Sequence, residues 1–352
     1  MVRVLTVPDD YPTIQAAVNA AIPGDTVHVS SGTYYESVMV NKTVLLIGQN
    51  RETTIIAAGS TADTLALTAD GVLISNFTIG WGAVGIDMQN SNGNRIINNI
   101  IKENTNGATG SIYTDTIYEN NIVTANTYGL NFGQLNGPSS INNTAKNNEI
   151  YGNTIAGIYV SAANGNNTIS GNNIHDNGIG IILDHTQNNT VTNNTIKNNN
   201  LAGGYNYGIY LRNAIKNVID SNMFQGNNVA LHFINSSNGN KIFHNNFIGN
   251  PKDADGTSLN TWDNGYPSGG NYWSGYLQKY PHATEIDGSG IWNTPYVIDR
   301  DNVDNYPLIQ PWNPVSEFQP LFLLPLFVIA TLLAAVVLRR KRGDDHGGTA
   351  LH

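Results

Sequence analysis

The sequence contains no cysteine, and this absence removes several classes of site at once. Disulfide bridges, thiolate metal centres and cysteine nucleophiles are all excluded. Charged residues are also scarce, at 12% of the chain, and the formal net charge is -9. Since the chain has no basic stripe that could neutralise phosphates, we expect no nucleic-acid partner. An acidic polymer is not an obvious ligand either.

Asparagine, in contrast, supplies roughly one residue in seven, far above its average use in proteins. Much of it belongs to a repeated hexamer, Asn-x-apolar-x-x-Asn. The copies start between 22 and 28 residues apart, at Asn99, Asn121, Asn148, Asn172, Asn194, Asn222 and Asn245. This period is too short for helical-pair repeats, and the leucine-rich consensus of a horseshoe is missing. It fits one coil of a three-faced β-solenoid.

Two further signatures recur within each period. Gly-apolar-x-apolar starts at Gly85, Gly129, Gly157, Gly180 and Gly208, and Asn-x-apolar starts at Asn94, Asn167, Asn217 and Asn240. Alternation of period two predicts a short strand with one buried face for each piece. Three strands per coil predict an all-β fold, a right-handed parallel β-helix of three sheets over residues 1–250. Stacked coils place like residues above like, so the asparagines should form hydrogen-bonded ladders.

Both ends of such a stack need covers, because an open sheet edge invites aggregation. Residues 11–21 place Ile14, Ala17, Val18 and Ala21 on one helical face, which predicts an N-terminal cap helix. Residues 251–312, rich in Tyr, Trp, Pro and Gly, are the expected C-terminal cap.

The segment from Phe318 to Leu338 carries no charge for 21 residues, about the length that crosses a membrane. Four cations, residues 339–342, follow it directly. The positive-inside rule makes residues 339–352 a cytoplasmic tail and places the large N-terminal part outside the cell. We therefore expect a single-pass protein of the cell membrane. The N-terminus lacks the apolar core of a secretory signal, so either the true start lies upstream or insertion relies on this helix.

Three stretches point to a family. The opening TIQAAVNAAIPGDTVHVSSGTYYE, the NNxI coils, and the closing GGNYWSGY with DGSGIWNTPYVID and DNYPL together resemble archaeal NosD-like parallel β-helix proteins. The resemblance implies a β-helix of the carbohydrate-binding and sugar-hydrolase type. It also implies a role in supplying copper to nitrous oxide reductase.

The residues themselves give little support for copper. The histidines outside the tail and the methionines are scattered, at His28, His175, His185, His232, His244 and His282 and at Met39, Met88 and Met223. Copper needs such ligands brought together. Calcium is a better candidate, because Glu285, Asp287, Ser289 and Asn293 stand at positions 1, 3, 5 and 9 of a loop with Gly at position 6. Asp299 could complete the set, and a tight glycine-rich turn explains the same pattern.

Aligning the Gly-apolar-x-apolar strands puts one outward position of each coil into a column. The column reads Asp87, Asn131, Tyr159, Ile182, Tyr210 and His232. Its two tyrosines could stack on sugar rings. One position after the strands, Asp184 and Arg212 fall one coil apart and could pair, with His185 beside them. The candidate ligand-binding residues are Tyr159, Asp184, His185, Tyr210, Arg212 and His232. The alternative is an ordinary polar sheet face.

We find no stacked carboxylate pair on this face, although glycosidases need two carboxylates about 5–10 Å apart. No catalytic residue is therefore nominated. The sequence favours noncatalytic binding of an envelope polysaccharide or a neighbouring surface protein. A polysaccharide-active hydrolase, lyase or esterase, and a NosD-like copper-delivery protein, remain as alternatives.

Overall fold

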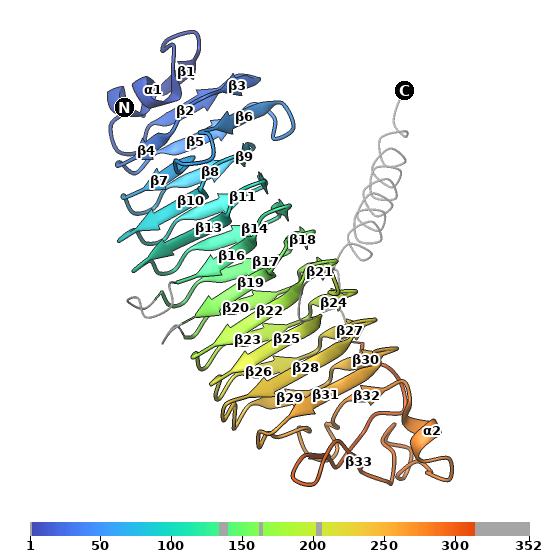
Figure 1. Cartoon of the computed structure of the whole chain (residues 1–352). Helices are drawn as coiled ribbons and strands as arrows, with labels where there is room; N and C mark the ends of the chain where they lie inside the picture. The colour runs from blue at the N-terminus through green and yellow to red at the C-terminus, as the bar shows by residue number, and fades with distance from the viewer. Residues whose placement is uncertain (1, 134–139, 162–164, 202–205, 314–352) are drawn as a thin grey trace, which may run out of the picture. The chain divides into compact units, whose positions relative to one another are not determined.

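The computed structural model describes residues 2–133, 140–161, 165–201 and 206–313. Within residues 1–312 the chain winds into a solenoid whose coils stack from the N-terminal helix to the aromatic C-terminal segment (Figure 1). Among the described residues, three long sheets, here called A, B and C, hold 11, 11 and 10 strands. Within each sheet, strands pair in parallel with the strands of the preceding and following coils. The three-sheet parallel solenoid is thus confirmed.

The coils pass through the sheets in the order A, B, C. Sheet A holds β1 (Val4–Val7), β2 (Thr26–Val29), β5 (Leu45–Gly48), β8 (Leu73–Ser75), β11 (Arg95–Ile97), β14 (Ile117–Glu119), β17 (Thr144–Lys146), β20 (Thr168–Ser170), β23 (Thr190–Thr192), β26 (Val218–Asp220) and β29 (Lys241–Phe243). Sheet B holds β3 (Gly32–Tyr34), β6 (Thr54–Ala57), β9 (Thr78–Gly80), β12 (Ile100–Lys102), β15 (Ile122–Thr124), β18 (Glu149–Tyr151), β21 (Asn173–His175), β24 (Thr195–Lys197), β27 (Met223–Gln225), β30 (Asn246–Ile248) and β32 (Tyr272–Trp273). Sheet C holds β4 (Val38–Val40), β7 (Leu65–Leu67), β10 (Val84–Gln89), β13 (Asn106–Ser111), β16 (Tyr128–Phe132), β19 (Ala156–Ser161), β22 (Ile179–Asp184), β25 (Tyr207–Arg212), β28 (Val229–Ile234) and β31 (Lys252–Gly256).

The core consists of columns of apolar side chains, one from each coil. In sheet B the middle residues Ile150, Ile174, Ile196 and Phe224 stand in register on successive strands, and all are fully buried. These are the third positions of the asparagine hexamer. The period-two alternation read from the sequence therefore assigns the inner face correctly.

Both asparagines of each hexamer belong to ladders that run along the corners of the solenoid, and all of them except the half-buried Asn250 are buried. At the corner between sheets A and B, Asn194 Oδ1 accepts hydrogen bonds from the backbone N and from Nδ2 of Asn172, each at 2.9 Å. The Nδ2 of Asn172 also donates to the carbonyl of Ala145 at 2.9 Å. Since every asparagine satisfies the backbone of its neighbour, the sharp corners leave few buried polar groups unpaired. This accounts for the unusual composition.

The described part of the chain contains three such ladders. The A–B ladder contains Asn99, Asn121, Asn148, Asn172, Asn194, Asn222, Asn245 and Asn271. The B–C ladder contains Asn104, Asn126, Asn153, Asn177, Asn199, Asn227 and Asn250. The C–A ladder contains Asn143, Asn167, Asn189, Asn217, Asn240 and Asn260.

The helix α1 (Ile14–Ala20) covers the N-terminal end, as the sequence predicts. Thr13 caps it, since its Oγ1 accepts a hydrogen bond from the backbone N of Ala16 at 3.1 Å. Ile14, Ala17 and Val18 are fully buried against the first coils. The helix therefore closes the core at this end.

The C-terminal end is closed by residues 257–312, which include α2 (Tyr276–Lys279), β33 (Tyr296–Val297) and β34 (Val303–Asp304). The rings of Trp262 and Trp273 lie buried at this end of the core. Coil pairing continues further than the hexamers, because β31 pairs with β28 and β32 with β30.

The cap also supplies the hydrogen-bond acceptors that the missing next coil would have provided. Asn302 Oδ1 accepts from Asn260 N and from the Trp262 indole, both at 3.0 Å. Asp304 Oδ2 accepts from Asn271 N at 2.8 Å and from the Trp273 indole at 2.9 Å. Two of the ladders thus end on the cap.

No helix in the described part of the chain is long and apolar enough to span a membrane. The segment Phe318 to Leu338, for which the sequence predicts a membrane helix, lies outside the described residues together with the tail 339–352.

Candidate binding face on sheet C

The outer face of sheet C carries the predicted column. Tyr159 of β19 pairs with Ile182 of β22, which pairs with Tyr210 of β25, and Tyr210 pairs with His232 of β28. The register read from the sequence is confirmed for these four strands. Earlier in the column, Asp87 is followed by Thr109 of β13, in a coil that the sequence reading left out, and Asp87 is only 8% exposed. A further expectation is corrected: Ile182 belongs to the outward column but is only 8% exposed.

A second column, which the sequence reading missed, explains this burial. Tyr128, Ala156, Ile179 and Tyr207 occupy the first position of their strands, one coil after another. The side chains of Tyr128, Tyr159, Tyr207 and Tyr210 pack against Ala156, Ile179 and Ile182. We call these seven residues and His232 the aromatic patch. The signal was available, since each member of the missed column immediately precedes the glycine of a Gly-apolar-x-apolar motif.

The rings of the patch stack on one another. Tyr128 and Tyr159 have centroids 5.6 Å apart. Tyr207 stacks on Tyr210 at 5.6 Å and on His232 at 4.3 Å, and these rings are within 11° of parallel. The rings remain partly exposed. Short strands with a fixed register therefore hold the aromatic surface in place before any ligand arrives.

Beside the patch, the fully buried carboxylate of Asp184 forms hydrogen bonds with three side chains. Arg212 Nε donates to Asp184 Oδ1 at 2.7 Å, and its Nη2 pairs with Oδ2. Tyr159 donates its hydroxyl to Oδ2 at 3.0 Å, and His185 Nδ1 lies 2.6 Å from Oδ1. The sequence thus predicts the Asp184–Arg212 pair correctly, but the acid is not on the surface.

These contacts fix the charge state of the cluster. Burial favours a neutral Asp184, but the hydrogen bonds from Arg212, His185 and Tyr159 and the charge of Arg212 outweigh it, so the pKa of Asp184 lies below its usual value. Burial, followed by the charge of Asp184, raises the pKa of Tyr159 above its usual value, so its hydroxyl keeps its proton. Asp184 is therefore an ionised centre that holds Tyr159 and Arg212 in place.

His185 lies at the corner after β22, with its side chain 51% exposed. Its Nε2 is 2.8 Å from the side-chain nitrogen of Asn213. An amide nitrogen only donates, so this orientation of the Asn213 amide assigns Nε2 as the acceptor and the ring proton to Nδ1, facing Asp184.

His232 has a different partner. Its Nδ1 pairs with Asp255 Oδ1, and Lys252 Nζ lies 3.0 Å from Asp255 Oδ2. Asp255 belongs to β31, beyond the last hexamer, so the sequence pattern could not place it. The cations and anions bordering the patch are thus paired with each other.

The predicted calcium ligands engage in local bonds. Glu285 Oε1 accepts from Gly290 N at 2.7 Å, and Asp287 accepts from the Tyr266 hydroxyl at 2.9 Å. Ser289 donates to the Ile286 carbonyl at 2.6 Å, and Asn293 Oδ1 accepts from Thr284 N at 3.1 Å.

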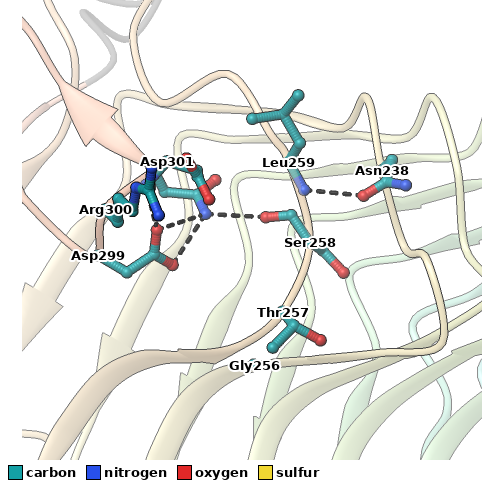
Figure 2. Close-up of a pocket in the computed structure, with 9 residues that line it drawn as sticks. Asn238, Gly256, Thr257, Ser258, Leu259, Asp299, Arg300 and Asp301 are labelled. Carbon is teal, nitrogen blue, oxygen red and sulfur yellow. Dashed lines mark hydrogen bonds between the residues drawn. The ribbon is translucent and has the colours of Figure 1, made fainter.

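Asp299 lies elsewhere, in a pocket of about 530 Å³ whose lining includes Ser258 and Arg300 (Figure 2). There its carboxylate accepts from Asn302 Nδ2 at 2.8 Å. Across the described ranges, no group of three or more His, Cys, Asp or Glu residues is placed to hold a metal ion. The calcium loop stays a prediction from the sequence.

Comparison with known proteins now places the fold in a family. The family model described as "Periplasmic copper-binding protein (NosD)" matches residues 18–206 and 142–278. The chain belongs to the NosD family. This NosD-family chain is 25% identical over 154 residues to the "Probable ABC transporter binding protein NosD" of Stutzerimonas stutzeri, covering 41% of this chain and 34% of that protein. It is 30% identical over 318 residues to the "Cell surface glycoprotein" of Methanothermus fervidus, covering 78% of this chain and 52% of that protein.

The NosD-family chain thus spans about half or less of each of these curated relatives. Among solved structures, ORF18 of Geobacillus virus E2 matches with a TM-score of 0.58 and 16% identity, covering 73% of this chain and 61% of that one. DFA-IIIase from Arthrobacter chlorophenolicus matches with a TM-score of 0.54 and 12% identity, covering 70% of this chain and 80% of that one. These likenesses show the fold alone.

The family description raises copper again, and the described residues do not fit it. Copper sites bring imidazole, thiolate or thioether ligands together. Here His175 is bonded to Glu149 and Asp176, His185 to Asp184, and His244 to the Ser268 carbonyl. These three histidines thus lie in different coils, and each bonds a partner of its own.

Proposed function

We propose that this NosD-family chain is a noncatalytic carbohydrate-binding protein of the cell surface. The observation that carries the proposal is the aromatic patch on sheet C, where four tyrosines pack against three apolar side chains and His232 stacks on Tyr207. Aromatic surfaces suit the C–H faces of sugar rings, and tyrosine hydroxyls at the margin can bond sugar hydroxyls.

The electrostatics favour a neutral sugar. Asp184 is paired with Arg212, and Asp255 is paired with Lys252 and also contacts His232 Nδ1. A charged ligand would have to displace one of these pairs, whereas a neutral ligand needs only stacking and hydroxyl contacts. The envelope polysaccharide of the cell itself or of a neighbour is the ligand class that fits. A surface protein is the other partner that the sequence allows.

The location rests on other evidence. One relative is named a cell surface glycoprotein, and the uncharged stretch from Phe318 to Leu338 is followed by four cations. We propose that this stretch anchors the solenoid on the outside of the cell membrane. Protease added to intact cells should then degrade the solenoid and spare residues 339–352; protection of the solenoid would refute the orientation.

The binding proposal is tested with a glycan array, comparing the wild type with a Tyr159→Ala/Tyr210→Ala variant. Tyr151→Ala is the matched control, because Tyr151 is also an exposed tyrosine stacked on a histidine, but on sheet B. Binding lost only in the sheet C variant, without cleavage of the glycan, supports the proposal. No binding by the wild type, or equal loss in both variants, refutes it.

A polysaccharide-active enzyme is the second candidate, and one observation favours it. The buried Asp184 bonds His185 Nδ1, and the His185 side chain is 51% exposed; a histidine oriented by a carboxylate is the arrangement of a general base. Shortened or unsaturated products from a bound glycan, lost in His185→Gln, would establish this function instead.

A further inference from the structure

A second feature of the surface lies at the corner between sheets B and C, outside the aromatic patch. It is an open groove of about 530 Å³. Its lining comes from successive coils and includes Trp81, Glu103, Thr105, Thr127 and Thr154. Because neighbouring coils are stacked along the solenoid, the groove runs parallel to its axis.

Trp81 occupies a corner position with left-handed backbone. Its φ is +59°, where a bulky side chain carries a conformational cost. The equivalent residues of the later coils also adopt positive φ; they are Glu103, Ala125, Gly152, Asp176, Asn198, Gly226 and Gly249. Trp81 is the bulkiest side chain of this set, and among these residues it alone carries an aromatic ring.

The chemistry of the groove matches a sugar. Trp81 offers an aromatic ring, Thr105, Thr127 and Thr154 offer hydroxyls, and Glu103 offers a carboxylate that can accept bonds from sugar hydroxyls. Lys102 Nζ lies 4.7 Å from the centre of the Trp81 ring and 3.3 Å from Glu103 Oε1. Here too the cation and the anion are paired, as they are around the aromatic patch.

The groove leads to the patch. Thr127 lines the groove, and the next residue, Tyr128, belongs to the patch and stacks on Tyr159. From there the patch continues along later coils to Tyr207, Tyr210 and His232. The two features together form one track that follows the axis from the coil of Trp81 to the coil of His232.

We propose that the corner groove is a second contact site for the same saccharide, so that the ligand is a long neutral polysaccharide lying along the solenoid axis. This inference rests on the proposed function of the aromatic patch. Two linked contacts raise the affinity for a chain that reaches both, and add nothing for a chain that reaches only one.

The test is affinity measured on the full chain with neutral polymers, namely dextran, pullulan, laminarin, galactan and mannan, beside disaccharides and trisaccharides prepared from each. Trp81→Asn removes the ring and suits the left-handed backbone, so the variant should fold at least as well as the wild type. Its thermal unfolding is measured as a check. Glu103→Gln is a second variant that keeps the shape of the groove. Tyr210→Ala removes a ring of the aromatic patch and so measures the contribution of the patch to binding.

Trp81→Asn should weaken polymer binding roughly tenfold or more and leave binding of the short sugars unchanged. Tyr210→Ala should weaken both. Unchanged polymer affinity in both Trp81→Asn and Glu103→Gln, with Tyr210→Ala still damaging, overturns the groove and leaves the proposed function standing. Equal loss for long and short sugars in Trp81→Asn overturns the two-contact arrangement. If the wild type binds none of the polymers, the proposed function itself fails, and the groove inference falls with it.

Discussion

Replacing Asn199 with alanine removes one rung of the B–C ladder. Its Oδ1 accepts from the backbone N of Asn177 at 3.2 Å and from Asn177 Nδ2 at 3.0 Å. Its Nδ2 donates to the carbonyl of Ile174 at 3.2 Å and to Asn227 Oδ1 at 3.1 Å. The residue is fully buried, so water does not compete for these bonds in the folded chain.

The loss of stability depends on which hydrogen bonds the neighbouring asparagines retain in the variant. Asn177 Nδ2 still donates to two carbonyls, and Asn227 Oδ1 still accepts from the backbone N of residue 199. The backbone N–H of Asn177 loses its acceptor, and an orphaned buried donor costs about 1–3 kcal/mol. Adding about 1 kcal/mol for the lost bond to the Ile174 carbonyl, we expect the free energy of unfolding to fall by about 2–4 kcal/mol.

Urea unfolding followed by circular dichroism measures this change. Asn200→Ala is the matched control, because Asn200 is the next residue and is exposed; it should change stability by less than about 0.5 kcal/mol. Hydrogen exchange at the Asn177 amide should accelerate in Asn199→Ala alone. If the two variants unfold alike and that amide stays protected, the ladders do not stabilise the corners as argued.

Three further predictions concern single sites. Arg212→Met should lower the free energy of unfolding by about 1–3 kcal/mol, because it leaves the buried Asp184 charge without its main partner; urea unfolding that matches the wild type would contradict this. Burial raises the pKa of Asp304 to about 7, so the folded carboxyl keeps a proton that the unfolded chain loses near pH 4. The protonated carboxyl stabilises the fold fully below about pH 4, and this contribution declines as the pH rises to about 7. The free energy of unfolding of the wild type should therefore fall by roughly 2–4 kcal/mol more than that of Asp304→Asn over this range. If the free energies of unfolding of the two proteins change in parallel with pH, the prediction is refuted. Ile174→Asp should abolish the β spectrum in circular dichroism by burying a charge, whereas Tyr210→Ala should leave the spectrum unchanged, and equal damage would overturn the inner and outer assignment.

The repeat made most of the solenoid predictable. Ile174 and Ile196 could be assigned to the core and Asn172 and Asn194 to a ladder, because a fixed period converts sequence spacing into spatial register. The same register predicted that Asp184 and Arg212 meet. The N-terminal helix was predictable from its own apolar face.

What could not be predicted involves contacts outside the repeat. Asn302 and Asp304 end two ladders from a segment about which the hexamer spacing says nothing. The burial of Asp184 and Ile182 depends on side chains packing across neighbouring columns, and column alignment alone does not give it. Tyr128 and Tyr207 are a different case. They precede the glycines of the Gly-apolar-x-apolar motif, so the sequence pattern could have predicted their column.

The ladders also give the solenoid a direction. Along the ladders, the backbone N of one asparagine donates to the Oδ1 of the asparagine in the following coil, so a ladder begins with an acceptor. The A–B and C–A ladders end with donors, the backbone N of Asn271 and of Asn260. At the start, the backbone N of Phe77 and of Gly82 meet the first acceptors, while the far end needs oxygens such as those of Asn302 and Asp304. The two ends of the solenoid therefore differ chemically, and the N-terminal cap could not replace the C-terminal cap or the reverse. Coils can be inserted or deleted in the middle without disturbing either end, whereas a second copy could extend the stack only head to tail.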